Sequence, residues 1–161
     1  MEASPLALLQ ALCHSEVKFI LVGGLSAVLH GAPLVTQDVD IVPSRAPANL
    51  ERLLAVLGEL DAAYRTRPEL RPGISHLASP GHQNLVTRHG WLDVLGTVGQ
   101  GLGYEELISE SEPVEVGAGL LVQVLSLERY IALKEALGGE KDRAMLPLLR
   151  RTLQEQRKPR G

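Results

Sequence analysis

Two aspartates sit inside an otherwise apolar strand, an arrangement that few folds tolerate. In the stretch "VGGLSAVLHGAPLVTQDVDIV", from Val22 to Val42, Asp38 and Asp40 are separated by a single valine. Residues i and i+2 of a strand point to the same face, so the two carboxylates are expected on one side. Such charges repel each other and resist burial, and a divalent cation such as Mg²⁺, with its preference for oxygen ligands, compensates for both effects. The segment therefore predicts a metal site built on a strand.

A second apolar strand carries a third carboxylate. In "WLDVLGTV", Asp93 occupies the middle of the apolar run. If this strand lies beside the first, three carboxylates converge, which is enough to hold two metal ions roughly 4 Å apart for phosphoryl displacement. The alternative interpretation is that Asp93 pairs with an arginine such as Arg88.

A glycine pair precedes the two aspartates. Gly23 and Gly24 lie between the strand-like "VKFILV" and the helix-like "LSAVLH". Glycines at such a junction let the backbone approach a ligand closely, and the free N–H groups at a helix N-terminus favour phosphate. With metal on one side and these N–H groups on the other, the segment indicates a clamp for a triphosphate.

Strand-like and helix-like segments alternate along the whole chain. Helices are predicted from Pro5 to about His14 and from Pro47 to about Leu60, a strand at "ISHLAS", and a hairpin from "NLVTR" and "WLDVL". A short helix at "YEELIS", two strands around a Gly-Ala-Gly turn and two final helices complete the pattern. We expect an α/β (α+β) fold with a mixed sheet flanked by helices and a C-terminal helical pair. Residues 1–125 would form the core and 126–161 a helical extension of the same domain.

Composition restricts the remaining possibilities. The chain has 161 residues, of which 45% are hydrophobic, and no stretch approaches 18 consecutive apolar residues, so no membrane span is expected. The N-terminal segment lacks the basic region of a signal peptide, and the single Cys13 reads as a small core residue. A cytoplasmic location fits both features. Aromatic residues make up only 3%, which argues against binding of single-stranded nucleic acid by base stacking.

These motifs resemble the signature of the DNA polymerase β-type nucleotidyltransferase superfamily, which has a glycine pair, a helix and then D-x-D on a strand. The chain is most similar to small stand-alone bacterial members, some of them toxin or abortive-infection components, which have "HG-x-P" followed by "T-x-D-x-D". "RHGWLDVLG" resembles their third-carboxylate strand, and "VLSLERYIALKEALGGEKD" resembles their C-terminal segment. The matching residues are His30, Gly31, Pro33, Thr36, Asp38, Asp40, Asp93, Lys134, Lys141 and Asp142.

The resemblance implies a polymerase β-type fold and transfer of a nucleoside monophosphate from an NTP to a hydroxyl of an RNA end, a protein or a small molecule. It implies Mg²⁺ or Mn²⁺ as cofactor, with Asp38, Asp40 and Asp93 as metal ligands and catalytic residues. A partner antitoxin would be a separate chain. The nucleotide-binding residues that the resemblance implies are Gly23, Gly24, Ser26, Thr36, Lys134 and Lys141.

The sequence also differs from the family pattern. Leu25 stands where many members have a phosphate-binding serine directly after the glycine, and Leu34 stands where relatives often carry arginine. An alternative function is therefore a catalytically degenerate member that binds a nucleotide or a partner. "DVDIV" also fits the nucleophile motif of haloacid dehalogenase-type phosphatases, but in that family the motif follows a long apolar strand, whereas "GAPLVTQ" precedes it here.

Overall fold

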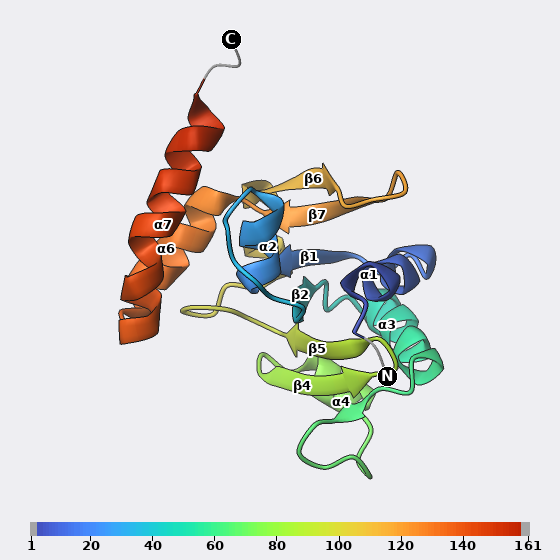
Figure 1. The fold of residues 1–161 in the computed structure, drawn as a ribbon. Coiled ribbons are helices and arrows are strands. Elements are labelled where there is room, and N and C mark those ends of the chain that lie inside the picture. The colour runs from blue at the N-terminus through green and yellow to red at the C-terminus, as the bar shows by residue number, and fades with distance from the viewer. Residues whose placement is uncertain (1–2, 159–161) are drawn as a thin grey trace.

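A seven-stranded mixed sheet forms the centre of the molecule, with strands in the order β3-β4-β5-β2-β1-β7-β6 (Figure 1). The computed structural model describes residues 3–158. Residues 1–2, at the start of the N-terminal segment, and residues 159–161, at the end of the predicted C-terminal extension, lie outside the described residues.

The elements alternate along the chain as the sequence predicts. The strands are β1 (Phe19–Val22), β2 (Val39–Pro43), β3 (Ala63–Tyr64), β4 (His82–Thr87), β5 (Gly90–Leu95), β6 (Ser111–Glu115) and β7 (Leu121–Leu125). The helices are α1 (Pro5–His14), α2 (Gly23–Leu29), α3 (Pro47–Glu59), α4 (Ile74–Ala78), α5 (Tyr104–Leu107), the 3₁₀ helix η1 (Ile108–Glu110), α6 (Leu127–Leu137) and α7 (Glu140–Arg157).

Most predicted elements are confirmed, and their capping residues explain where they begin. The Ser4 hydroxyl accepts a hydrogen bond from the Ala7 N–H at the start of α1, and the Ser126 hydroxyl accepts one from the Arg129 N–H at the start of α6. The predicted hairpin is present as β4 and β5, which pair antiparallel. The fold class is thus the expected α+β architecture.

One element was predicted wrongly. The segment "ISHLAS" forms the helix α4 and not a strand. Its one fully buried side chain is Leu77, so the segment lacks the alternating burial of a strand. It instead covers the sheet beside α3, where Leu77 enters the core. Tertiary packing decides the structure of such a short segment, since its local sequence preference is weak.

The central strands set the geometry of the site. β2 lies between β1, to which it is antiparallel, and β5, to which it is parallel. β1 in turn is parallel to β7. Strands that are distant in sequence therefore become neighbours, and the residues of β2 and β5 are aligned pair by pair.

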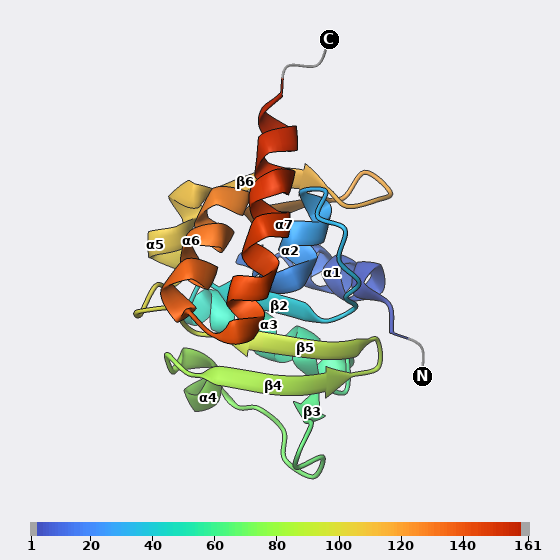
Figure 2. The ribbon, with the colours of Figure 1, turned by 60° about the vertical axis from the view of Figure 1, so that its left-hand side comes forward.

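Helices cover both faces of the sheet, as Figures 1 and 2 show with α1 and α3 on one side and α6 and α7 on the other. Alternate residues of the strands separate accordingly. Val39 and Ile41 of β2 join the core on the α1 and α3 side, whereas Val42 joins the core on the α6 and α7 side. Leu92 and Val94 of β5 likewise face α1 and α3. The residues between them, Asp40 and Asp93, consequently point to the side of α6 and α7.

Polar contacts fix the C-terminal helices to this second face. Arg129 of α6 binds Glu110 through both Nε and Nη2. His30, which is almost wholly buried, bonds through Nε2 to the Leu125 carbonyl at 2.8 Å and through Nδ1 to the Gln156 amide at 3.0 Å. The histidine of the "HG-x-P" motif therefore joins the end of α2 to β7 and α7.

Candidate functional site

The carboxylates of β2 and β5 lie side by side. Asp40 is paired in register with Asp93 on one neighbouring strand and with Val22 on the other. The sequence predicts this convergence only if the two strands are adjacent, and the parallel pairing of β2 with β5 makes them so. Two carboxyl groups at the same level of adjacent strands are close enough to influence each other directly.

Asp40 lacks a counter-charge of its own. Its Oδ1 atom is buried and has no hydrogen-bond partner. Burial is the main reason why the pKa of Asp40 rises from 3.8 to about 7, and a shared hydrogen bond with Asp93 and the negative charges of Asp93 and Asp38 raise this pKa further. A buried carboxylate oxygen without a hydrogen-bond partner destabilises the folded protein. The packing around Asp40, and not a bond to this oxygen, therefore keeps the side chain in place.

Gly23 makes room for Asp40. Its φ angle is +73°, and a Cβ atom at this position would lie 2.0 Å from Asp40 Oδ2. Only glycine satisfies both conditions. Gly24 differs, because a Cβ atom there would meet Thr36 Cγ2 at 3.5 Å, an ordinary contact distance. The two glycines therefore have different roles, and the first is required by a carboxylate of the site.

Asp93 has the pairing that Asp40 lacks. Arg65, which follows β3, donates from Nη2 to Asp93 Oδ1 at 2.5 Å, and both side chains are about four-fifths buried, with exposures of 19% and 22%. The expected arginine partner was Arg88, but Arg88 binds Asp61 at 3.4 Å on the surface. Asp93 does pair with an arginine, but with one that the sequence places 28 residues away.

Asp38 lies outside the strand. Both aspartates were expected inside one strand, but β2 begins at Val39, and Asp38 is exposed in the segment before it. Its N–H donates to the Thr36 hydroxyl at 3.3 Å, so Thr36 shapes the backbone before β2. Asp38 is near enough to raise the pKa of Asp40 through its charge. Of the two aspartates, Asp40 is therefore positioned by the strand and Asp38 by the loop before it.

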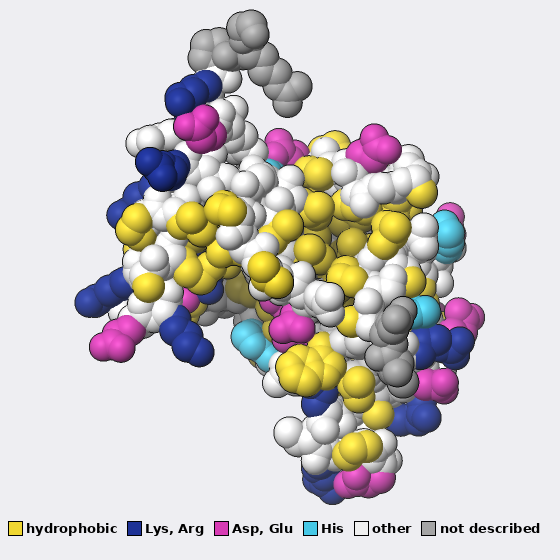
Figure 3. All heavy atoms as spheres, in the orientation of Figure 1, with side chains coloured by type: hydrophobic (Ala, Val, Ile, Leu, Met, Phe, Trp, Pro, Cys, Tyr) yellow, Lys and Arg dark blue, Asp and Glu magenta, His cyan; other side chains and the backbone are white. Residues whose placement is uncertain are grey.

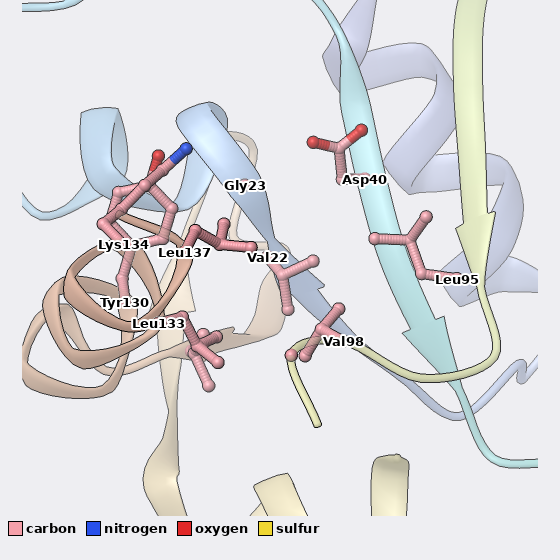
Figure 4. A pocket seen from close by; sticks show the side chains of 11 residues that line it. Val22, Gly23, Asp40, Leu95, Val98, Tyr130, Leu133, Lys134 and Leu137 are labelled. Atoms are coloured by element: carbon pink, nitrogen blue, oxygen red, sulfur yellow. The ribbon is translucent and has the colours of Figure 1, made fainter. Parts of the chain in front are cut away.

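A pocket of about 120 Å³ opens between the glycine turn and α6. Asp40 and Gly23 line one side, and Tyr130 and Lys134 line the other (Figure 4). Lys134 donates to Asp142 Oδ1 at 2.9 Å. Burial by itself lowers the pKa of Lys134, but its contacts with Asp142 and Tyr130 outweigh burial, and the pKa is raised. The lysine is therefore held as a cation in a pocket that also contains Asp40.

Two other predicted nucleotide-binding residues, Ser26 and Lys141, do not line this pocket. Ser26 is fully buried, and its hydroxyl donates to the Gly23 carbonyl at 2.6 Å, so it stabilises the first turn of α2 and is withdrawn from solvent. Lys141 is exposed at the start of α7. Leu25 and Leu34, which depart from the family pattern, pack into the two cores on opposite faces of the sheet.

The donor set suits a hard cation. Asp38, Asp40 and Asp93 offer carboxylate oxygens, and the buried, unpartnered Oδ1 of Asp40 is the kind of atom that a metal ion would satisfy. Within residues 3–158, however, no three His, Cys, Asp or Glu side chains form a recognisable metal cluster. Asp38 is exposed ahead of β2, and Asp93 is engaged by Arg65.

Charged side chains are unevenly distributed over the surface of the molecule. On the face seen in Figure 3, Lys and Arg side chains gather along the C-terminal helices and toward the end of the molecule near β3, while hydrophobic side chains occupy much of the middle. Across the described part of the chain, no helix is both long enough and apolar enough to cross a bilayer.

Comparison with known proteins gives support at the level of the fold. No protein-family model matches the sequence, and a search of curated proteins finds no significant match. Among solved structures, the chain is similar to a crystal structure of a "putative nucleotidyltransferase" from Thermotoga maritima, with a TM-score of 0.58 and 20% sequence identity. The superposition covers 92% of this chain and 89% of that chain. The mixed sheet with its flanking helices is therefore a nucleotidyltransferase-like fold.

Proposed function

We propose that this protein is a metal-dependent nucleotidyltransferase that moves a nucleoside monophosphate from an NTP to a hydroxyl. The observation that carries the proposal is the state of Asp40. Its carboxyl group is half-buried beside Asp93, opposite a glycine whose Cβ would collide with it, and its buried Oδ1 atom has no hydrogen-bond partner. Natural proteins retain such an unfavourable arrangement mainly where function requires it.

The residues present could hold Mg²⁺ or Mn²⁺ through Asp38, Asp40 and Asp93. When bound, the ion would neutralise phosphate charge and lower the pKa of an attacking hydroxyl. The chain itself would supply the rest of the site. The Gly23–Gly24 turn would bring backbone N–H groups to the phosphates, and Lys134, in the same pocket as Asp40, would add a positive charge.

In the proposed reaction, the hydroxyl oxygen attacks the α-phosphorus of the NTP and pyrophosphate leaves. Asp93, which lies beside Asp40, would accept the proton of the hydroxyl as a positioned general base does. Acceptors to be compared are an RNA end, a protein side chain and a small molecule. If the protein acts as a toxin, its antitoxin would be a separate chain.

The test is incubation with each labelled NTP, Mg²⁺ or Mn²⁺, and total cellular RNA or protein. Transfer of label to any acceptor by the wild type, and none by Asp40→Asn, is the expected result. Phosphatase activity on an aryl phosphate without any NTP would instead favour a haloacid dehalogenase-type reaction and contradict the proposal.

A second candidate is nucleotide binding without turnover. It is favoured by two departures from the family pattern: Leu25 and Leu34 stand where a phosphate-binding serine and an arginine are expected, and both pack into the cores. Tight NTP binding by calorimetry with no label transfer to any acceptor would select this function.

A further inference from the structure

Arg65 is fixed to the sheet by its own backbone. It follows β3 at the edge of the sheet, and its N–H donates to the Asn84 carbonyl at 3.1 Å. Asn84 is the residue of β4 that pairs in register with Asp93. The Arg65 side chain crosses β4, with Nη1 3.5 Å from the Leu85 carbonyl, and reaches Asp93 on the next strand. Its backbone anchor and its target thus lie on adjacent strands at one level.

Trp91 supports the guanidinium from one side. It lies two residues before Asp93 on β5, so both side chains point to the same face. The Arg65 guanidinium carbon lies 4.4 Å from the centroid of the Trp91 ring, which is a cation–π contact. The indole is 52% exposed, although it is the only tryptophan of the chain. Burial does not explain this residue, whereas contact with Arg65 does.

These contacts restrict what Asp93 can do. Its Oδ1 is bonded to a guanidinium that is fixed by the β4 backbone and by an aromatic ring. The guanidinium does not hold Oδ2, so Oδ2 is the oxygen that is available on the side of the site. A carboxylate held in this way cannot rotate freely, and a group that must meet a reacting atom benefits from such restriction.

We propose that Arg65 and Trp91 are positioning residues for Asp93. Together they hold Oδ1 of Asp93, so that this carboxylate takes part in the reaction through Oδ2. The inference rests on the proposed nucleotidyl transfer. Arg65 fixes the orientation of the Asp93 carboxylate. Trp91 acts only through Arg65, because its ring holds the guanidinium in position.

A mutant cycle with Arg65→Met, Trp91→Leu and the double variant tests this arrangement in the full chain. We expect Arg65→Met to lower the transfer rate about tenfold to a hundredfold, and Trp91→Leu about fivefold. The double variant should be no slower than Arg65→Met, because Trp91 has nothing to support once the guanidinium is absent. Arg65→Lys should fall between wild type and Arg65→Met. NTP affinity by calorimetry should stay within about twofold in all variants, since neither residue lines the pocket beside Lys134.

Arg88→Met is the matched control, since this arginine of the β4–β5 turn binds Asp61 on the surface and not Asp93. Its rate should equal that of the wild type. The proposal is overturned if Arg65→Met keeps the wild-type rate, if the effects of Arg65→Met and Trp91→Leu multiply in the double variant, or if NTP affinity falls in parallel with the rate.

A readout without substrate separates this proposal from the proposed function. In metal-free wild-type protein, NMR should show slowly exchanging Arg65 guanidinium protons shifted by the Trp91 ring. Trp91→Leu should remove the ring shift, and Asp93→Asn should remove the slow exchange. Absence of these signals in the wild type would overturn the positioning role even if transfer occurs, whereas their presence without any transfer would reject only the enzymatic proposal.

Discussion

Asp40 and Asp93 occupy the same level of adjacent strands, yet their surroundings are opposite. On the β2 side, Asp40 faces a glycine turn and has a buried oxygen without a partner. On the β5 side, Asp93 is bound by an arginine that rests on an indole. The first carboxyl is an unfavourable feature of the folded protein, whereas the second is part of a stabilising pair. The β5 side is therefore organised by contacts within the chain, whereas the β2 side keeps an unpartnered oxygen for which the proposed function offers a metal ion.

The largest effect is expected from removing the charge of Asp40. Asp40→Asn should lower nucleotidyl transfer by roughly 10⁴-fold, because it removes the central donor of the proposed metal site. In metal-free buffer at pH 8 the same variant should melt several degrees above the wild type, since it removes an unpaired buried charge. Transfer assays and calorimetric melting measure the two effects. A variant that melts well below the wild type would mean that Asp40 has a structural role.

Asp93→Asn should lower the stability of the protein, whereas Asp40→Asn should raise it. Transfer should fall by roughly 10²-fold while NTP affinity is retained, because the glycine turn and Asp40 remain. At pH 6, where Asp40 is mostly protonated, the variant should lose about 1–3 kcal/mol of unfolding free energy, since Arg65 loses its carboxylate in a largely buried place. Urea unfolding at pH 6 measures this loss. Equal shifts for the Asn variants at positions 40 and 93 would remove the contrast between the two sides.

The glycine pair allows a matched comparison. Gly23→Ala should destabilise the protein by about 3 kcal/mol or more, because its Cβ would lie 2.0 Å from Asp40 Oδ2 at a φ of +73°. Gly24→Ala should change stability by less than about 1 kcal/mol, since its Cβ would make an ordinary contact with Thr36. Chemical denaturation of both variants is the measurement. Asp40→Asn combined with Gly23→Ala should keep most of the loss, because the steric conflict persists.

Stability should depend on pH through Asp40. Its pKa is about 7 in the folded protein, where burial is the main cause, and 3.8 is its ordinary value. An acid with a raised folded-state pKa contributes stability that is complete below about pH 4 and is lost as the pH rises through about 7. The difference in unfolding free energy between wild type and Asp40→Asn should therefore change by on the order of 2–4 kcal/mol between pH 4 and pH 8 without metal. A pH-independent difference would contradict the burial of an ionisable Asp40.

The smallest effect is expected at Ser26. Ser26→Ala removes the hydroxyl that donates to the Gly23 carbonyl, which should cost about 1 kcal/mol of stability. NTP affinity should stay unchanged, because the hydroxyl is buried and turned to the backbone. Calorimetric titration with NTP is the measurement. A clear loss of affinity would restore Ser26 as a phosphate-binding residue.

The sequence by itself determined the order of elements and the faces of the central strands. Alternation in "VDIV" and "LDVL" sends Val39, Ile41, Leu92 and Val94 to one core and the two aspartates to the other face, since strand periodicity is local. Cap residues such as Ser4 and Ser126 likewise act on their own helices and could be recognised directly. The carboxylate residues of the candidate site were therefore predictable one by one.

Only the tertiary structure decided how those residues are paired. The parallel register of β2 with β5 brings Asp40 to Asp93, and the edge position of β3 brings in Arg65, which no local pattern connects with either aspartate. The nearest candidate in sequence, Arg88, binds elsewhere. In the same way, "ISHLAS" is a helix because the core beside α3 accepts Leu77. Strand order and long-range contacts depend on the packing of the whole chain. The sequence was therefore enough to identify the carboxylates, whereas their partners could be identified only from the fold.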